Sequence, residues 1–92
     1  MARRVLFRAH ALQRLFERRI GVTEVLAILQ SGDVIARYDD DRPYPSRLVL
    51  GWSQGRPLHV VAADDPTSDI TVVITVYEPA PDLWSADFRG RR

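Results

Sequence analysis

The segment ITVVITVY, residues 70–77, decides the fold class, because β-branched and aromatic residues favour extended backbone. Two prolines follow it, and the turn-forming DDPTSD at 64–69 precedes it. Toward the N-terminus, further strands are predicted at 58–63, 47–52 and 34–38, and the SQG at 53–55 joins two of them in a hairpin. Strands with such short connections pair antiparallel, so we expect a four-stranded antiparallel sheet.

Two short helices are predicted before the strands. Apolar residues recur at helical spacing over Ala9–Arg19, and Gly21 is placed to end this helix in a left-handed conformation. Thr23 offers an N-cap hydroxyl to a second helix at Glu24–Ser31. The side chains expected to face the core are Leu12, Leu15 and Phe16 in the first helix, and Val25, Leu26, Ile28 and Leu29 in the second.

The chain end and the chain length complete the predicted architecture. Residues 82–88 are expected to form one helical turn that packs Trp84 and Phe88 back on the sheet. A chain of 92 residues suffices for one domain and not for two. The predicted fold is therefore a single α+β domain over residues 1–92, with two N-terminal helices, a four-stranded antiparallel sheet and a short C-terminal helical turn.

Composition excludes several classes of protein. The chain has no Cys, which excludes disulfides, thiolate metal sites and a cysteine nucleophile. No apolar stretch approaches the roughly 20 residues that span a bilayer. The start, MARRVLF, lacks the apolar run of a secretory signal. We therefore expect a cytoplasmic protein without membrane contact.

The net charge of +1 hides an asymmetry along the chain. Residues 1–20 contain six Arg and one Glu, which gives +5, whereas residues 33–69 contain seven Asp and four Arg, which gives −3. All thirteen basic residues are Arg and none is Lys. Every cation is therefore a planar fork that suits bidentate contact with phosphate or carboxylate.

Strand alternation predicts which sheet residues share a face. The predicted core face is Leu48, Leu50, Trp52, Leu58, Val60, Ala62, Ile70, Val72, Ile74 and Val76. The other face is Arg47, Val49, His59, Val61, Val73, Thr75 and Tyr77. With His59 opposite Thr75, the side chains of His59, Thr75 and Tyr77 form one cluster. Such a cluster is either a hydrogen-bonded structural element or a proton-transfer site, and the sequence leaves both open.

The predicted first helix carries a polar stripe of His10, Arg14, Glu17 and Arg18. In one interpretation the stripe is a solvated helix face that has an ion pair between Arg14 and Glu17 and no function in binding or catalysis. As a functional face it binds anions beside a histidine that exchanges a proton near neutral pH. The sequence does not decide between these two interpretations.

Other familiar site patterns are missing. Two His separated by 49 positions, without Cys, match no metal-ligand spacing, so no metal or other cofactor is expected. The chain contains no G-x-S-x-G, and a phosphate loop of the Walker type requires a Lys that is absent. The acidic run at 39–41 is typical of a solvated loop.

Several long segments resemble a known bacterial family. These are HALQRLFERRIGVTEVLAIL from residue 10, SGDVIARYDDDRPYPSRLVLGW from residue 31, GRPLHVV from residue 55 and ITVYEPAPDLW from residue 74. They resemble the family catalogued as domain of unknown function four-two-five-eight, over about Phe7 to Phe88. That family is similar to the RelE/ParE-like toxins, and its genes often lie beside one for a YgiT-type zinc-finger antitoxin.

The resemblance implies a RelE-like fold and a type II toxin that acts as a metal-independent endoribonuclease on mRNA, free or on the ribosome. Such cleavage needs a proton acceptor, a proton donor and fixed cations around the phosphate. The residues that fit are His10, His59 and Tyr77 for proton transfer, and Arg14, Arg18, Arg47 and Arg56 for RNA. RelE-like enzymes often use Lys and Tyr, and this chain departs from them in having no Lys.

Two alternatives stay open beside the nuclease. The chain is either a noncatalytic module that binds protein or RNA, or an inactive relative of a toxin. The nuclease hypothesis requires His59, Tyr77 and Arg47 to project together from an uncovered side of the sheet.

Overall fold

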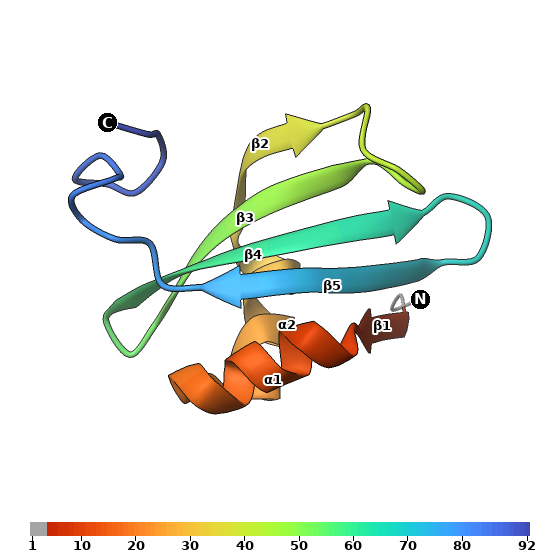
Figure 1. Ribbon diagram of the computed structural model, residues 1–92, viewed down its shortest axis with the longest axis horizontal. Helices are drawn as coiled ribbons and strands as arrows, with labels where there is room; N and C mark the ends of the chain where they lie inside the picture. Colours follow the sequence, from red (N-terminus) through yellow and green to blue (C-terminus); the bar gives the residue numbers. More distant parts are fainter. Residues whose placement is uncertain (1–3) are drawn as a thin grey trace.

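The strand at 70–77 lies inside the sheet, with a neighbour on each side. The computed structural model describes residues 4–92, so Arg3 of the basic segment lies outside the described part. Its elements are β1 (Arg4–Phe7), α1 (Ala9–Arg18), α2 (Val22–Ser31), β2 (Asp33–Tyr38), β3 (Ser46–Ser53), β4 (Arg56–Asp65) and β5 (Ile70–Tyr77). The strand order is β1-β5-β4-β3-β2, and both helices lie on one side of the sheet (Figure 1).

The prediction of a four-stranded antiparallel sheet is wrong. The described residues form a five-stranded mixed sheet in which β1 pairs parallel with β5, with Arg4 beside Ile70 and Phe7 beside Val73. The four residues of β1 are too few to show an alternating pattern. Their partner strand also lies more than 60 positions later in the sequence, so no short turn between the two strands predicts the pairing.

The predicted C-terminal helical turn is also absent. Residues 78–92 form turns and one isolated bridge between Trp84 and Arg91, and no helix. The amides of Leu83 and Trp84 both bond to the carbonyl of Ala80, but the pattern stops there. A single unsupported turn does not propagate as a helix, because nucleation is costly and few residues follow to extend it.

The junction of the two helices is one residue tighter than predicted. Arg19, with φ of 55°, is the left-handed C-cap of α1, and the amide of Ile20 closes the helix on the carbonyl of Leu15. Gly21 is therefore not the end of α1 but the N-cap of α2. Its amide donates to the Glu24 carboxylate at 2.7 Å, which takes the place of the predicted Thr23 cap.

The predicted faces of the sheet are wrong because of the β3–β4 turn. Gln54 and Gly55, both with positive φ, form a two-residue turn that pairs Ser53 with Arg56. This register places Val49 opposite Val60, so Leu58 and Val60 share a face with Val49 and not with Leu48 or Leu50.

An irregularity in the β4–β5 pairing also moves the predicted partner of His59. The register shifts between Val61 and Ala62. The β4–β5 turn also closes on Asp65 and Ile70, one residue tighter than predicted. Together the two changes place His59 opposite Tyr77, and Thr75 opposite Val61.

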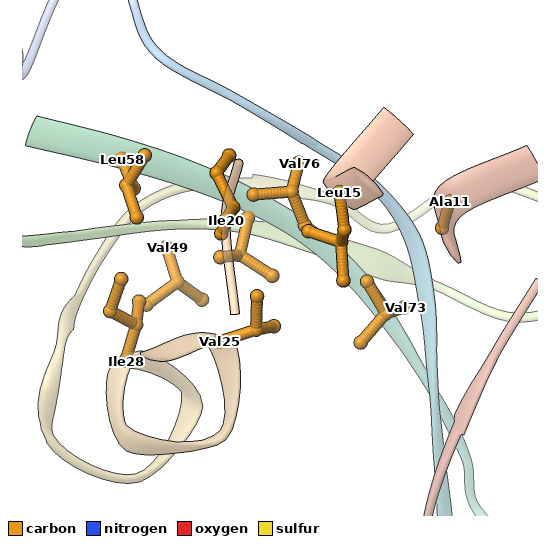
Figure 2. Packing of buried hydrophobic residues seen from close by; sticks show 10 residues of the cluster. Ala11, Leu15, Ile20, Val25, Ile28, Val49, Leu58, Val73 and Val76 are labelled. Atoms are coloured by element: carbon orange, nitrogen blue, oxygen red, sulfur yellow. The ribbon is translucent and has the colours of Figure 1, made fainter. Parts of the chain in front are cut away.

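The core lies between the sheet and the helices, as Figure 2 shows for its central side chains. Its buried members are Ala11, Leu15, Ile20, Val25, Ile28, Val49, Leu58, Val60, Val73 and Val76. Gly51 allows α2 to pack directly on β3, because a Cβ there would lie 2.4 Å from Cγ1 of Ile28. No helix within residues 4–92 has the length and apolar character needed to cross a membrane.

Three side chains that the helical pattern assigned to the core are on the surface: Leu12 is 45 % exposed, Phe16 is 88 % exposed and Leu26 is 39 % exposed. In α1 it is Ala11 and Leu15 that face the sheet. The apolar stripe was therefore placed too far around the helix, because the small Ala11 gives a weak apolar signal although it marks the closest approach to the sheet.

Candidate functional site

His59 and Tyr77 face each other from β4 and β5, on the side of the sheet without helices. His59 has no exposed surface. Its Nε2–H donates to the carbonyl of Phe88 at 2.9 Å, because a carbonyl can only accept, and Nδ1 then accepts from the Tyr77 hydroxyl at 3.1 Å. The Trp84 ring stands edge-on to the imidazole, with 4.4 Å between ring centroids. Both imidazole nitrogens are therefore occupied within the protein.

Burial also keeps this pair in its neutral form. Desolvation lowers the pKa of His59, because the charged imidazolium is disfavoured away from water, and the bond to the Phe88 carbonyl opposes this in part. Desolvation likewise raises the pKa of Tyr77. The two groups have the chemistry of a proton-transfer pair, but they meet the C-terminal residues and not an open cleft.

Arg47 lies on the opposite face of the sheet from His59. It is paired with Ala62 across β3 and β4, and its guanidinium contacts the carboxylate of Asp64, with Nε 3.3 Å from Oδ2. Asp64 also accepts from the Thr71 hydroxyl at 2.7 Å. The structure therefore does not bring Arg47 together with His59 and Tyr77 on one surface.

Four other predicted residues do come together, along α1 and the adjoining end of the sheet. Arg14 Nε donates to His10 Nε2 at 3.3 Å, and Arg18 donates to the Val76 carbonyl at 2.6 Å. Arg56 reaches the carbonyl of Arg18 at 3.3 Å. We call His10, Arg14, Arg18 and Arg56 the arginine edge.

Two carboxylates accompany the arginine edge. Arg14 lies 3.4 Å from Glu17, and Arg56 lies 3.2 Å from Glu78. His10 is exposed, in contrast to His59. The arginine edge can therefore bind anions and present a histidine to solvent at the same place. Among residues 4–92, no three His, Asp or Glu side chains are grouped so that they could hold a metal ion.

One comparison with known proteins identifies the family. A family model described as a domain of unknown function, DUF4258, matches residues 7–78. The chain belongs to the DUF4258 family. No curated protein and no solved structure matches it.

The DUF4258 match ends at Glu78, just after β5, and the residues beyond it are those that cover His59. This C-terminal segment, residues 79–92, is held to the sheet by several contacts. The rings of Trp52 and Phe88 meet edge-on at 5.9 Å, and Arg89 forms an ion pair with Asp33 at the start of β2. The guanidinium of Arg91 lies over the Trp84 ring at 5.4 Å. In this DUF4258 protein, His59 therefore helps to hold the C-terminal segment against the sheet.

The sequence did not lead us to predict that Phe16 lies on the surface. It also did not predict that Arg8, Arg42 and Tyr44 are neighbours. The latter three line one cavity, although Arg8 precedes α1 and the other two belong to the β2–β3 loop. The only available signal was the PYPS segment, whose prolines and tyrosine are unusual for a purely solvated loop. Its proximity to Arg8 depends on the β1–β5 pairing, which the sequence did not reveal.

Proposed function

We propose that this DUF4258 protein binds single-stranded RNA through the arginine edge. The observation that carries the proposal is the fixed array of three guanidinium groups along one side of α1 and the end of the sheet. Arg18 and Arg56 are held by backbone carbonyls, so their positions are set before a ligand arrives. Such preorganisation lowers the entropic cost of binding a phosphate chain.

The exposed aromatic ring on the same helix supports a nucleic-acid ligand. Phe16 is 88 % exposed, and Leu12, one turn earlier on α1, is 45 % exposed, so the two form one apolar surface. Proteins that bind single strands combine cations along the backbone path with aromatic rings on which bases stack. Phe16 lies two residues from both Arg14 and Arg18, roughly 160° around the helix from each, so it can stack a base only of a strand that wraps over α1.

The proposal is tested by fluorescence anisotropy with a labelled single-stranded RNA of about ten nucleotides, titrated at several salt concentrations. Arg14→Gln removes one phosphate contact, so the slope of log K against log salt should fall by roughly 0.7. Phe16→Ala should weaken binding by about 1–3 kcal/mol at all salt concentrations, because it removes a stacking surface. Arg37→Gln, an exposed arginine on the edge strand β2, is the matched control and should change neither quantity. Unchanged affinity in Arg14→Gln and Phe16→Ala would contradict the proposal.

A second candidate function is metal-independent RNA cleavage by a type II toxin. The site predicted from His59, Tyr77 and Arg47 does not form, because Arg47 lies on the opposite face and His59 is buried, so this function has to use other residues. It is favoured by one observation, the exposed His10 hydrogen-bonded to Arg14, together with the resemblance to RelE/ParE-like toxins. In this function His10 takes the proton of the attacking 2′-hydroxyl and returns it to the leaving 5′-oxygen, while Arg14 binds the phosphate. His59 and Tyr77 then hold the C-terminal segment in place. The cognate antitoxin, of the zinc-finger type, would cover the exposed Leu12 and Phe16.

Cleavage is tested with purified protein and RNA in EDTA, with and without ribosomes. His10→Gln should abolish cleavage, whereas His59→Gln should retain the rate per folded molecule. Induced expression should arrest growth, and co-expression of the neighbouring antitoxin should relieve the arrest. Intact protein that binds RNA but never cleaves it, in either setting, leaves RNA binding as the function and eliminates the nuclease.

A further inference from the structure

The side of the sheet without helices has a cavity of about 280 Å³ at the end away from His59. Its apolar floor consists of Ala63 from β4 and Val72 and Ile74 from β5. Arg8, Asp41, Arg42 and Tyr44 contribute its polar groups. Arg8 and Arg42 are 34 positions apart in the sequence and meet at this cavity only because β1 lies beside β5.

The cavity lining has two arginines, Arg8 and Arg42, and one carboxylate, Asp41. Neither Arg8 nor Arg42 forms an ion pair with a carboxylate of the described residues. Arg42 instead donates a hydrogen bond to the backbone carbonyl of Asp40. The one carboxylate in the lining, Asp41, already accepts the Ser46 hydroxyl at 2.5 Å. Arg8 is moreover the N-cap of α1, whose first turn contains no acidic residue, so the positive end of the helix dipole lies beside it.

The β2–β3 loop that supplies Arg42 and Tyr44 is fastened at two points. The Ser46 hydroxyl donates to Asp41, and the Asp65 carboxylate at the end of β4 lies close enough to the Tyr44 hydroxyl to raise its pKa. Asp65 is a firm anchor, because the Ser68 hydroxyl and the amide and hydroxyl of Thr67 hold the pKa of its carboxyl well below the ordinary value. The aromatic ring of Tyr44 is thereby fixed at the cavity wall.

A second arginine-lined cavity shows what makes this one distinctive. It has a volume of about 180 Å³, and its lining includes Arg37 and Arg47 together with two carboxylates, Asp39 and Asp64. Arg47 is engaged by Asp64. That cavity is balanced in charge, whereas the one between Arg8 and Arg42 has a surplus of cations, an apolar floor and an aromatic wall.

We propose that the cavity between Arg8 and Arg42 binds a single nucleotide, with its base on the apolar floor beside Tyr44 and its phosphate between the two guanidinium groups. At about 280 Å³ the cavity is just below the roughly 300–1,000 Å³ of pockets for drug-sized ligands, which limits its ligand to one nucleotide unit. Arginine forks suit the phosphate, and a carboxylate such as Asp41 accepts from exocyclic amino groups or ribose hydroxyls. We name the cavity the nucleotide pocket.

The nucleotide has two sources with the same chemistry. It is either a free nucleoside monophosphate or one nucleotide of the RNA strand that the arginine edge is proposed to bind. In the second case the inference rests on the proposed function and deepens it, because Arg8 immediately precedes α1 and joins the pocket to the arginine edge. A strand that follows α1 would then place one unstacked base in the pocket.

The experiment is an NMR titration of the full chain with AMP, GMP, CMP, UMP and inorganic phosphate, followed by RNA binding of the same variants. The nucleotide pocket predicts that at least one nucleotide shifts the amide signals of Ala63 and Val72 at lower concentration than inorganic phosphate does. Arg8→Gln and Arg42→Gln should each weaken that binding roughly tenfold, since each removes a hydrogen bond between charged groups. Arg37→Gln should leave it unchanged.

The outcomes separate this inference from the proposed function. If nucleotides bind in the pocket and Arg42→Gln also weakens RNA binding, the nucleotide belongs to the RNA strand. If nucleotides bind but RNA affinity is the same in Arg42→Gln, the free nucleotide is the ligand.

Three results overturn the nucleotide pocket. The first is that no nucleotide shifts the Ala63 and Val72 signals. The second is that inorganic phosphate binds as tightly as every nucleotide, which would show a simple anion site. The third is that an acidic peptide displaces all nucleotides and binds more tightly, which would assign the pocket to a protein partner. RNA binding that depends on Arg14 would survive each of them.

Discussion

The two ends of the helix-free sheet face are built from the same strands but serve different purposes. At one end, His59 and Tyr77 lie beneath Trp84 and the backbone of Phe88, and the C-terminal segment occupies the surface (Figure 1). At the other end, beyond the pair of Val61 and Thr75, residues of β4 and β5 form the floor of the nucleotide pocket. The two ends differ in the segment that lies beside them. Residues 79–92 cover His59 and Tyr77, whereas the β2–β3 loop lines the nucleotide pocket and leaves it open.

This difference teaches that residue type alone does not assign a role in a sheet. His59 and Tyr77 have the chemistry of a catalytic pair, and they hold a chain segment. Ala63 and Val72 have the chemistry of a core, and they form the floor of a cavity whose lining has two arginines and one carboxylate. The covered end should therefore respond to substitution in stability, and the open end in ligand binding.

The largest expected effect is at the covered end, from Trp84→Ala. Trp84 is 8 % exposed and packs against the His59 ring, so its truncation leaves a large cavity and exposes the imidazole. The free energy of unfolding, measured by urea titration, should fall by about 3–5 kcal/mol. Trp84→Phe should lose less, because an aromatic edge remains, and Leu83→Ala, at a residue 49 % exposed, should stay within about 0.5 kcal/mol. Equal small losses at both positions would show that the segment does not pack on the sheet.

A smaller effect is expected from pH, because His59 is buried in its neutral form. Its pKa in the folded protein lies below the ordinary value of 6.5 that applies to the unfolded chain. The unfolded state therefore binds more protons as the pH falls below about 6.5, and stability present at pH 7.5 is lost toward pH 5.5 by at most about 1.4 kcal/mol per pH unit. Urea titrations across this range measure the loss.

The two histidines provide the control for that pH dependence. His59→Gln keeps a donor for the Phe88 carbonyl without a group that titrates here, so its stability should be nearly independent of pH between 5.5 and 7.5. His10→Gln should retain the dependence of the unsubstituted chain. A dependence that follows His10 instead would reverse the assignment of the two residues.

The smallest effect is expected at the open end, from Ser46→Ala. The Ser46 hydroxyl is buried and fixes Asp41 in the loop that carries Arg42 and Tyr44. Its loss should cost about 1 kcal/mol in urea titration, since one hydrogen bond is removed beside solvent, and it should weaken nucleotide binding because the loop loosens. Ser85→Ala removes a similar hydroxyl–carboxylate pair, with Asp87, at the covered end. It should lower stability by a similar amount without any change in nucleotide affinity.

The places where sequence reasoning failed share one physical cause. Periodicity found the strand segments at 34–38, 47–52, 58–63 and 70–77, and both helices to within two residues, because these signals are local. It assigned the faces of the sheet wrongly, because a two-residue turn at Gln54–Gly55 and a register shift near Val61 each change which side chains lie together. It missed β1, whose partner lies more than 60 positions away.

In the candidate site, too, the sequence predicted the local groupings and not the contacts between distant segments. His10, Arg14 and Arg18 are neighbours because they share one helix, so spacing alone could group them, and the structure adds Arg56 through the carbonyl of Arg18. His59 and Tyr77 were grouped on the sheet, but the sequence could not show that Trp84 and Phe88 would cover them. Arg47 was placed with them through the wrong register.

The sequence by itself determined that this chain forms two short helices and a β-sheet with a basic N-terminal helix, because repeat period, turn residues and charge are properties of neighbouring positions. Only the tertiary structure decided that β1 pairs with β5, which histidine is covered, and that Arg8 meets Arg42. These features depend on contacts between segments far apart in the chain, and they form only when burial of the core brings those segments together.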